Sequence, residues 1–449
     1  MRTPKPETRN SKPETFVSWF RSVAPYVNGF RGSTFVVAFG GEVVADGRFV
    51  ERVHDFNLLA SLGIRLVLVH GARPQIETRL AEQGIETGFV QGKRITDAVA
   101  LQCVKESVGR VRSEIEALLS MGLANSPMAN ADIRVAGGNF VTARPIGVLE
   151  GADMLHTGEV RKIDAAAIRG RLDAGDMVLL SPLGYSPTGE IFNLSMEDVA
   201  AGAAAALNAA KLIFLMDTAG VLDKNGELLR ELTLDAAERM AGKAAKLLPE
   251  DVRLYLPCAV RACRGGVARS HLVSRHVDGA LLLELFTRSG IGTMISQGSL
   301  ENLRTARIED IGGILQIIEP LEAEGVLVRR GRELLEREIG RFVVLEHDRM
   351  IVGCAALYPF PGAKSGELAC LAVHPERRSR GGGELLLRQI ETLARKRGLE
   401  QLFVLTTRAE HWFVERGFEE IPAEKLPRQR QAMYNLQRRS KVFVKHLSP

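Results

Sequence analysis

The stretch from Glu367 to Gly398 constrains the fold most, because a short apolar run is followed by a basic, glycine-rich turn and by leucines at helical spacing. The pattern predicts a strand up to Val373, a loop, and a helix starting near Glu384. Three glycines in the loop let the backbone approach a ligand: Gly381, Gly382 and Gly383. Free N–H groups of the helix would point at the same place, so the loop predicts a phosphate-binding site.

Arginines add positive charge beside these donors: Arg377, Arg378 and Arg380. The order Arg378-x-x-Gly381-x-Gly383 after a strand resembles the coenzyme A pyrophosphate loop of the GNAT acetyltransferase family. The chain continues as that family does, through a strand over 401–406 and a helix that ends in Arg-Gly-Phe. The resemblance implies acetyl-CoA as co-substrate, with these residues in contact with it: Cys370, Leu371, Val373, Arg378, Gly381, Gly382 and Gly383.

Length and composition set further bounds. A chain of 449 residues predicts two or three domains, and a hydrophobic content of 45% suffices for packed cores. Apolar runs are too short to cross a bilayer and the first residues have no hydrophobic signal core, so we expect a cytoplasmic protein with no membrane partner. The five cysteines are odd in number and lack C-x-x-C spacing, so neither disulfides nor a metal site is expected.

Positive charge gathers in the last third of the chain. From residue 301 onward, 25 Lys and Arg stand against 21 Asp and Glu, which places +4 of the net +5 there. Anionic small ligands account for this excess. Nucleic acid is the competing explanation, because five basic residues cluster at the end: Arg428, Arg430, Arg438, Arg439 and Lys441. A single tyrosine and no aromatic ladder accompany them, so no nucleic-acid partner is expected.

The first two-thirds of the chain has the pattern of an open, mainly parallel α/β sheet. Residues 1–14 are polar and predict a flexible arm, and apolar residues from Phe16 to Val27 predict an amphipathic helix with an aromatic face. That helix covers its own domain or binds another subunit. Strands are expected at 34–39, 65–69, 177–181 and 211–216, several of them closed by small residues before helices.

The order of motifs resembles the amino-acid kinase fold, and most closely its N-acetylglutamate kinase branch. The matching segments are Val67–Ile76, Gly92–Asp97, Phe192–Ala200, Leu212–Asp223 and Gly279–Ile295. Such a domain would span 15–296. Kinases of this branch carry a lysine in the pattern Lys-x-Gly-Gly, whereas Ala38 stands here, and Arg73 replaces a glycine of their phosphate loop. Since phosphoryl transfer depends on charge stabilisation, we expect a kinase shape without kinase activity.

The end of this domain resembles arginine-sensitive kinases of the branch. In those proteins L-arginine lies between an N-terminal helix and a segment like 281–293, with a glutamate pairing the guanidinium. The resemblance implies an allosteric L-arginine site that includes Tyr26, Glu284 and Gly290. It also implies a homo-oligomer of more than two copies, with a hexamer as one form.

A connector over 297–303 leads to a smaller α+β domain over 304–449, with antiparallel strands at 342–346 and 350–358. An amine attacks a thioester only as the free base, so the chemistry needs a proton acceptor, for which Glu367 is the candidate. Backbone N–H groups near Cys370 and Leu371 would bind the thioester oxygen. Cys370 as an acyl-enzyme nucleophile is the weaker alternative, and Thr406 or Tyr434 would protonate the leaving thiolate.

A kinase-like domain fused to a GNAT domain resembles the N-acetylglutamate synthase family, which acetylates L-glutamate at the head of arginine biosynthesis. The resemblance implies that Arg330 and Arg439 bind the glutamate carboxylates, since arginine pairs such groups through two hydrogen bonds. We therefore expect direct acetyl transfer to L-glutamate under the control of L-arginine. The alternatives are a working N-acetylglutamate kinase fused to an acetyltransferase, a non-catalytic arginine sensor, and acetylation of another amine.

Overall fold

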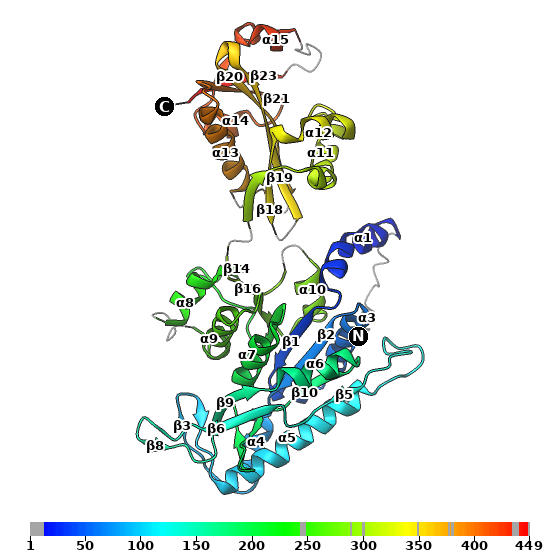
Figure 1. Ribbon diagram of the computed structural model, residues 1–449, viewed down its shortest axis with the longest axis vertical. Helices are drawn as coiled ribbons and strands as arrows, with labels where there is room; N and C mark the ends of the chain where they lie inside the picture. The colour runs from blue at the N-terminus through cyan, green and yellow to red at the C-terminus, as the bar shows by residue number, and fades with distance from the viewer. Residues whose placement is uncertain are drawn as a thin grey trace, which may run out of the picture. The chain divides into compact units, whose positions relative to one another are not determined.

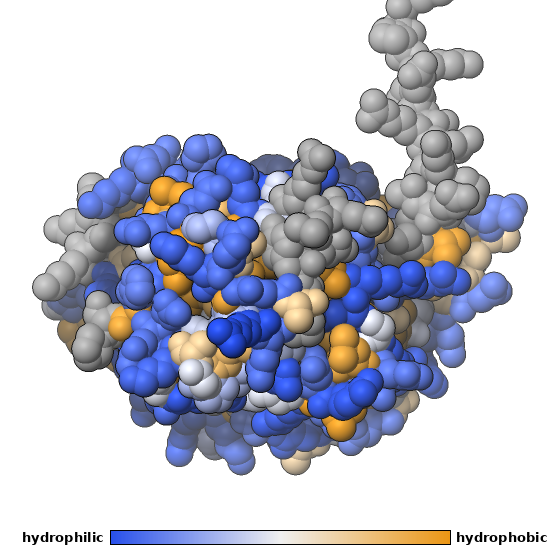
Figure 2. Space-filling view, turned by 90° about the horizontal axis from the view of Figure 1, so that it is seen from above, coloured by the Kyte–Doolittle hydropathy of each residue, from blue (hydrophilic) through white to orange (hydrophobic). Residues whose placement is uncertain are grey.

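The computed structural model describes residues 13–447 apart from 243–247, 288–289, 299–300, 348–349, 376–377, 379–380 and 433–439. Most of the predicted N-terminal arm lies outside these residues. The chain forms two compact units, Met1–Gly298 and Ser299–Pro449 (Figure 1). Among the described residues, no helix is long and apolar enough to cross a membrane. Hydrophilic side chains dominate the face shown in Figure 2, with smaller hydrophobic groups between them.

An eight-stranded sheet forms the centre of the first unit, in the order β14-β16-β15-β13-β1-β2-β10-β5. Its strands are β1 (Thr34–Phe39), β2 (Arg65–His70), β5 (Val135–Ala136), β10 (Met177–Leu180), β13 (Lys211–Met216), β14 (Glu231–Thr233), β15 (Arg269–Ser274) and β16 (Thr293–Ser296). All neighbouring pairs are parallel except β15 with β16. The expected mainly parallel sheet is confirmed.

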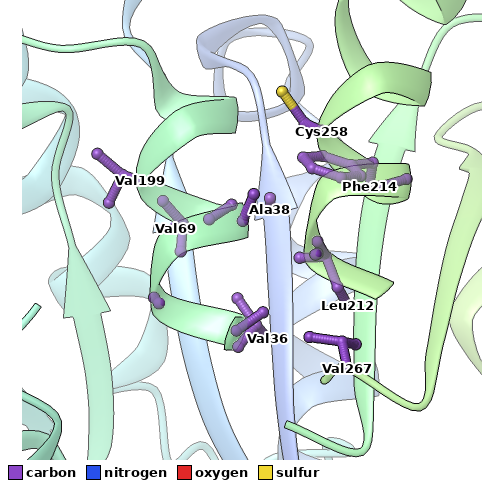
Figure 3. Packing of buried hydrophobic residues seen from close by; sticks show 14 of the residues in the cluster. Val36, Ala38, Val69, Val199, Leu212, Phe214, Cys258 and Val267 are labelled. Carbon is purple, nitrogen blue, oxygen red and sulfur yellow. The ribbon is translucent and has the colours of Figure 1, made fainter. Parts of the chain in front are cut away.

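Strand β1 is an unbroken apolar run because helices cover both faces of the sheet. Val36 and Ala38 face a cluster that includes α7 (Met196–Leu207) and α9 (Glu250–Arg264). The alternate residues, such as Phe35, face α3 (Phe49–Ser61), α5 (Ala98–Leu119) and α10 (Ala280–Phe286). Figure 3 shows Ala38 among Val69, Val199 and Phe214.

Smaller elements complete this unit. A four-stranded sheet contains β6 (Val141–Pro145), β9 (Gly158–Ile163), β11 (Leu183–Tyr185) and β12 (Ile191–Asn193). Two short hairpins pair β3 (Phe89–Val90) with β4 (Lys93–Arg94) and β7 (Val148–Leu149) with β8 (Ala152–Asp153). The other helices are α1 (Pro13–Phe30), α2 (Gly41–Ala45), α4 (Arg73–Glu82), α6 (Ala165–Asp173) and α8 (Leu234–Gly242).

Helix α1 is divided between a buried end and an exposed end. Its last turns pack on the core through Val23, Tyr26 and Phe30, and Phe30 contacts Phe286 with ring centroids 5.8 Å apart. In contrast, Phe16, Trp19 and Phe20 are 55%, 51% and 62% exposed. Helix α1 therefore covers its own domain only with the C-terminal half of the predicted aromatic face.

The second unit is built on a seven-stranded sheet in the order β17-β18-β19-β20-β21-β23-β22. Its strands are β17 (Glu301–Thr305), β18 (Phe342–His347), β19 (Met350–Phe360), β20 (Ser365–Val373), β21 (Gln401–Thr406), β22 (Glu419–Ile421) and β23 (Lys441–His446). Its α-helices are α11 (Ile311–Ala323), α12 (Arg332–Glu338), α13 (Gly382–Lys396), α14 (Glu410–Val414) and α15 (Arg428–Gln431). Helices α13 and α11 cover opposite faces of the sheet (Figure 1).

One sequence boundary differs from the structure. The expected connector over 297–303 overlaps β17, which starts at Glu301 and pairs antiparallel with β18. The polar residues of this strand hide it in the sequence, because β17 is an edge strand and only half-buried.

Ala38 provides a test of the core. Its side chain is fully buried among apolar groups, so Ala38→Lys would place an ammonium without a counter-charge there. We expect the free energy of unfolding to fall by about 3 to 5 kcal/mol. Chemical denaturation followed by circular dichroism measures it. The matched control is Val99→Lys, since Val99 is 54% exposed on α5, and an equal loss in both variants would contradict the assignment.

Candidate functional site

A cleft opens in the second unit where two parallel strands separate. Strands β20 and β21 pair only from Ser365 to Glu367, opposite 401–403, although both continue further. Beyond that point they enclose a cavity of about 1040 Å³, lined on one side by Glu367–Leu371 and on the other by Val404–Thr406. This volume lies at the upper end of the range for small-molecule sites, so the cavity has room for a large ligand.

A β-bulge lies in the wall of this cleft. Ala356 pairs with Ala369 and Cys354 pairs with Ala372, so β20 contains one more residue than β19 over this stretch. Cys370 has a φ of +51°, which is rare for a residue with a side chain. A bulge removes backbone groups from the hydrogen-bonded ladder between strands. This bulge lies in the region whose backbone N–H groups were predicted to bind the thioester oxygen. Nothing in the sequence Ala-Cys-Leu-Ala predicted the bulge.

The predicted phosphate loop leads into the N-terminus of α13. Gly381 caps this helix with a φ of +79°, a conformation that favours glycine, and no side chain caps the helix. A Cβ atom at Gly382 would lie 3.0 Å from Leu345, and one at Gly383 would lie 3.2 Å from the Trp412 ring. Arg378 lines the cavity and donates to the Val373 carbonyl. Arg377 and Arg380 lie outside the described residues.

A further cation at this end of the cavity was missed by the sequence analysis. Arg416 donates to Glu384 at 2.6 Å, and its guanidinium lies 4.1 Å from the centroid of the Trp412 ring. All three side chains line the cavity. The Arg-Gly-Phe segment therefore brings a positive charge to the first turn of α13.

Glu367 lies at the point where the strands separate, and its carboxylate is paired with Arg430 of α15. Arg430 donates from Nε to Oε2 at 2.6 Å and from Nη2 to Oε1 at 3.1 Å. Both side chains are largely buried, with 12% and 15% exposure. In the sequence, Arg430 stands out only as a member of a basic cluster near the end of the chain, because Glu367 lies 63 positions away.

A second guanidinium lies near the same carboxylate. Arg330 lies against the Tyr358 ring, and Tyr358 is directly opposite Glu367 in the sheet. The Tyr358 hydroxyl donates to Glu338 at 2.7 Å, and burial together with this contact raises the pKa of Tyr358 to about 12. Burial alone would lower the pKa of Arg330, but Cys370, Tyr358 and Glu367 raise it. Arg330 is thus a permanent positive charge in the cavity wall.

The remaining predicted residues of this site divide into two groups. Thr406 is buried in the cavity wall, and its hydroxyl oxygen accepts from the backbone N–H groups of Arg408 and Ala409. The Cys370 thiol also lines the cavity, where burial raises its pKa to about 11. Tyr434 and Arg439 lie outside the described residues.

The predicted arginine site in the first unit centres on a buried chain of polar groups. Glu284 lies 2.7 Å from His271 Nδ1 and accepts from the N–H groups of Ile291 and Gly292. His271 Nε2 is 3.1 Å from Lys211 Nζ, so Nε2 accepts and Nδ1 carries the proton. Burial and Lys211 lower the pKa of His271 to about 4. Burial would raise the pKa of Glu284, but hydrogen bonds from His271, Gly292 and Ile291 lower it to about 2.

Of the other two predicted residues, Gly290 lies against Glu284, and Tyr26 contacts Phe30 with ring centroids 6.0 Å apart. A Cβ atom at Gly290 would lie 2.5 Å from Glu284 Oε2, which explains the glycine. Tyr26 and Phe30 lie on α1, and Lys211 Nζ is 5.1 Å from the Phe30 ring centroid. Neither Lys211 nor His271 was predicted, because Lys211 reaches His271 only through the pairing of β13 with β15, and His271 contacts Glu284 of α10 only in the folded unit.

The kinase-like cleft of the first unit is altered at its glycines. A cavity of about 470 Å³ is lined by Gly40, Gly41 and Gly71, among other residues. The carboxylate of Glu42 lies over the Gly40 backbone, where a Cβ atom would be 2.0 Å from it, and burial raises the pKa of Glu42. Arg73 is held over the Phe89 ring at 5.1 Å. In the part of the chain that the structure describes, no three His, Cys, Asp or Glu side chains are grouped to hold a metal.

Comparisons with known proteins agree with both units. Residues 33–274 match the amino acid kinase family and residues 313–418 match the acetyltransferase (GNAT) family. The amino-acid acetyltransferase of Pseudomonas fluorescens is 55% identical over 432 residues, covering 96% of this chain and 99% of its own. The chain belongs to the amino-acid acetyltransferase family.

Two solved structures of N-acetylglutamate synthase from Neisseria gonorrhoeae, each 40% identical, match 97% of this chain and 100% of theirs. The complex with coenzyme A and L-arginine has a TM-score of 0.85, and the complex with coenzyme A and N-acetyl-glutamate has one of 0.61. The prediction of an acetyltransferase formed by a kinase-like domain and a GNAT domain is confirmed.

Cys370 permits a test of direct transfer. With a pKa of about 11, about one thiol in a thousand is ionised at pH 8. We expect Cys370→Ser to keep kcat within about threefold of the parent, since a thiol that does not attack loses little by becoming a hydroxyl. Steady-state kinetics with acetyl-CoA measures this. A loss of several orders of magnitude with unchanged folding would instead indicate an acyl-enzyme.

Proposed function

We propose that this protein transfers the acetyl group of acetyl-CoA to the α-amino group of L-glutamate, as the first step of arginine biosynthesis. One observation carries the proposal: a single cavity combines a helix N-terminus with cations at one end and a carboxylate with guanidinia at the other. The first end suits the pyrophosphate of CoA, and the second suits an acidic amine. The Neisseria relative in complex with coenzyme A and N-acetyl-glutamate supports this reading.

The proposed reaction is direct. Acetyl-CoA lies in the cleft between β20 and β21, with its pyrophosphate at the N-terminus of α13. Glu367 accepts a proton from the substrate ammonium, and the free amine attacks the thioester carbon. Backbone N–H groups at the bulge near Cys370 stabilise the negative oxygen. The C–S bond then breaks and the attacking nitrogen loses its second proton. Thr406 or Tyr434 protonates the thiolate, and the proton lost from nitrogen restores that hydroxyl group.

The acceptor carboxylates are assigned to arginines. Arg330 lies in the cavity wall beside Tyr358. Arg439 lies outside the described residues and directly precedes Ser440 in the sequence, and Ser440 lines the cavity. Glutamate has two carboxylates, and paired hydrogen bonds from guanidinium groups distinguish them from neutral amino-acid side chains. Arg330 and Arg439 are therefore the proposed substrate-binding residues.

We further propose control by L-arginine at the first unit, through Tyr26, Glu284 and Gly290. A cationic guanidinium suits a buried carboxylate whose pKa is lowered to about 2. The Neisseria relative was solved in complex with L-arginine. The exposed aromatic end of α1 supports a homo-oligomer. We also propose a cytoplasmic location, because the proposed reaction is a biosynthetic step.

An acceptor panel tests the reaction. We expect the parent to acetylate L-glutamate in preference to aspartate, lysine and ornithine. Glu367→Gln should lower kcat by about 10²- to 10⁴-fold, because the amide cannot accept the ammonium proton. Steady-state rates of CoA release measure both. The control is Glu400→Gln, whose carboxylate is 66% exposed and pairs with Lys364. A parent that ignores glutamate, or a Glu367→Gln variant as fast as the parent, would refute the proposal.

The arginine proposal is tested at Glu284. We expect the rate of the parent to depend on L-arginine and the Glu284→Gln variant to need at least about tenfold more effector, because the neutral amide loses a charged hydrogen bond. Each variant is compared with its own rate in the absence of arginine. An unchanged arginine response in Glu284→Gln would show that the effector binds elsewhere.

A further inference from the structure

The contact between Arg430 and Glu367 differs from the other cation contacts of the cavity. It joins both carboxylate oxygens to two nitrogens of one guanidinium, at 2.6 and 3.1 Å, with both side chains largely buried. In comparison, Arg378 is exposed and donates to a carbonyl, while Arg416 holds Glu384 at the phosphate end. Arg430 is therefore the residue that fixes the predicted base among the described residues.

A glutamate on a strand has three side-chain torsions, so its carboxylate needs a fixed partner to hold one orientation. Glu367 occupies the last position at which β20 pairs with β21, where it lies opposite Phe403. On the other side of β20, its partner on β19 is Tyr358. A planar guanidinium that binds through two parallel hydrogen bonds fixes both the place and the plane of the carboxylate. Lysine, with a single charged nitrogen, fixes only the place.

We propose that Arg430 is a positioning residue for the general base Glu367, and this inference rests on the proposed function. The guanidinium stays protonated throughout and takes no part in proton transfer. Its role is to aim one carboxylate oxygen at the substrate ammonium, which releases a proton to Glu367 before the free amine attacks. The arginine comes from α15, near the end of the chain, whereas the base Glu367 lies on the central sheet. A late segment of the chain therefore positions a residue of the sheet.

The alternative role for Arg430 is to bind a carboxylate of the acceptor. The two roles predict different kinetics. A positioning residue acts through Glu367, so its removal lowers kcat and has no effect once Glu367 is already lost. A residue that binds the acceptor raises KM for glutamate, whether or not the base is present.

A double-mutant cycle of Arg430→Gln and Glu367→Gln decides between them in the full-length protein. We expect Arg430→Gln to lower kcat by about 10²-fold, since misplacing a reacting group by about 1 Å has such an effect, and to leave KM for acetyl-CoA within twofold. In the Glu367→Gln background the same change should have no further effect on kcat. Arg430→Lys should recover part of the lost rate.

Two controls keep the result interpretable. Arg428→Gln changes an exposed arginine of the same helix and should match the parent, and thermal unfolding verifies that each variant folds. The cycle uses the acceptor that the panel shows to be best. If glutamate is not a substrate, the proposed function is refuted, but the cycle with the other acceptor still tests the role of Arg430. Equal losses of kcat in both backgrounds, or a raised KM for the acceptor at unchanged kcat, would overturn it.

Discussion

The separation of β20 from β21 after three paired residues is the constraint on which the acetyltransferase unit depends. Two parallel strands that stayed in register would close the sheet, whereas here they open a cavity whose wall contains the bulge at Cys370. The same separation places Glu367 at the inner end of the cavity. It leaves the uncapped N-terminus of α13 at the other end. The proposed oxyanion donors, the proposed base and the proposed phosphate site therefore all line one cavity.

The first unit has the opposite character, because its kinase-like cleft is altered while a separate polar network is well formed. Ala38 is fully buried among apolar groups, and the Glu42 carboxylate lies over the Gly40 backbone, where it would repel a phosphate. His271 links Lys211 to Glu284, and Glu284 also accepts from the backbone N–H group of Ile291. These features are the basis for the proposal that this unit binds an effector and does not transfer a phosphoryl group.

The sequence predicted the strands and glycines well, because apolar runs and left-handed turns are local features. Strands β13 and β21 have the expected bounds, and Gly381 has the positive φ that a glycine permits. What it missed depends on contacts across the fold. Arg430 contacts Glu367, which is 63 residues away in the sequence. The bulge at Cys370 contains no residue typical of turns, so no sequence pattern indicated it. The edge strand β17 was taken for a connector because its side chains are polar.

The central claim is that one cavity holds the thioester and the acidic amine together. Initial rates measured while both acetyl-CoA and L-glutamate are varied test it most directly. Transfer within a ternary complex predicts double-reciprocal lines that intersect. Parallel lines would contradict the account, because they would show that the acetyl group passes first to the protein and that CoA leaves before glutamate binds.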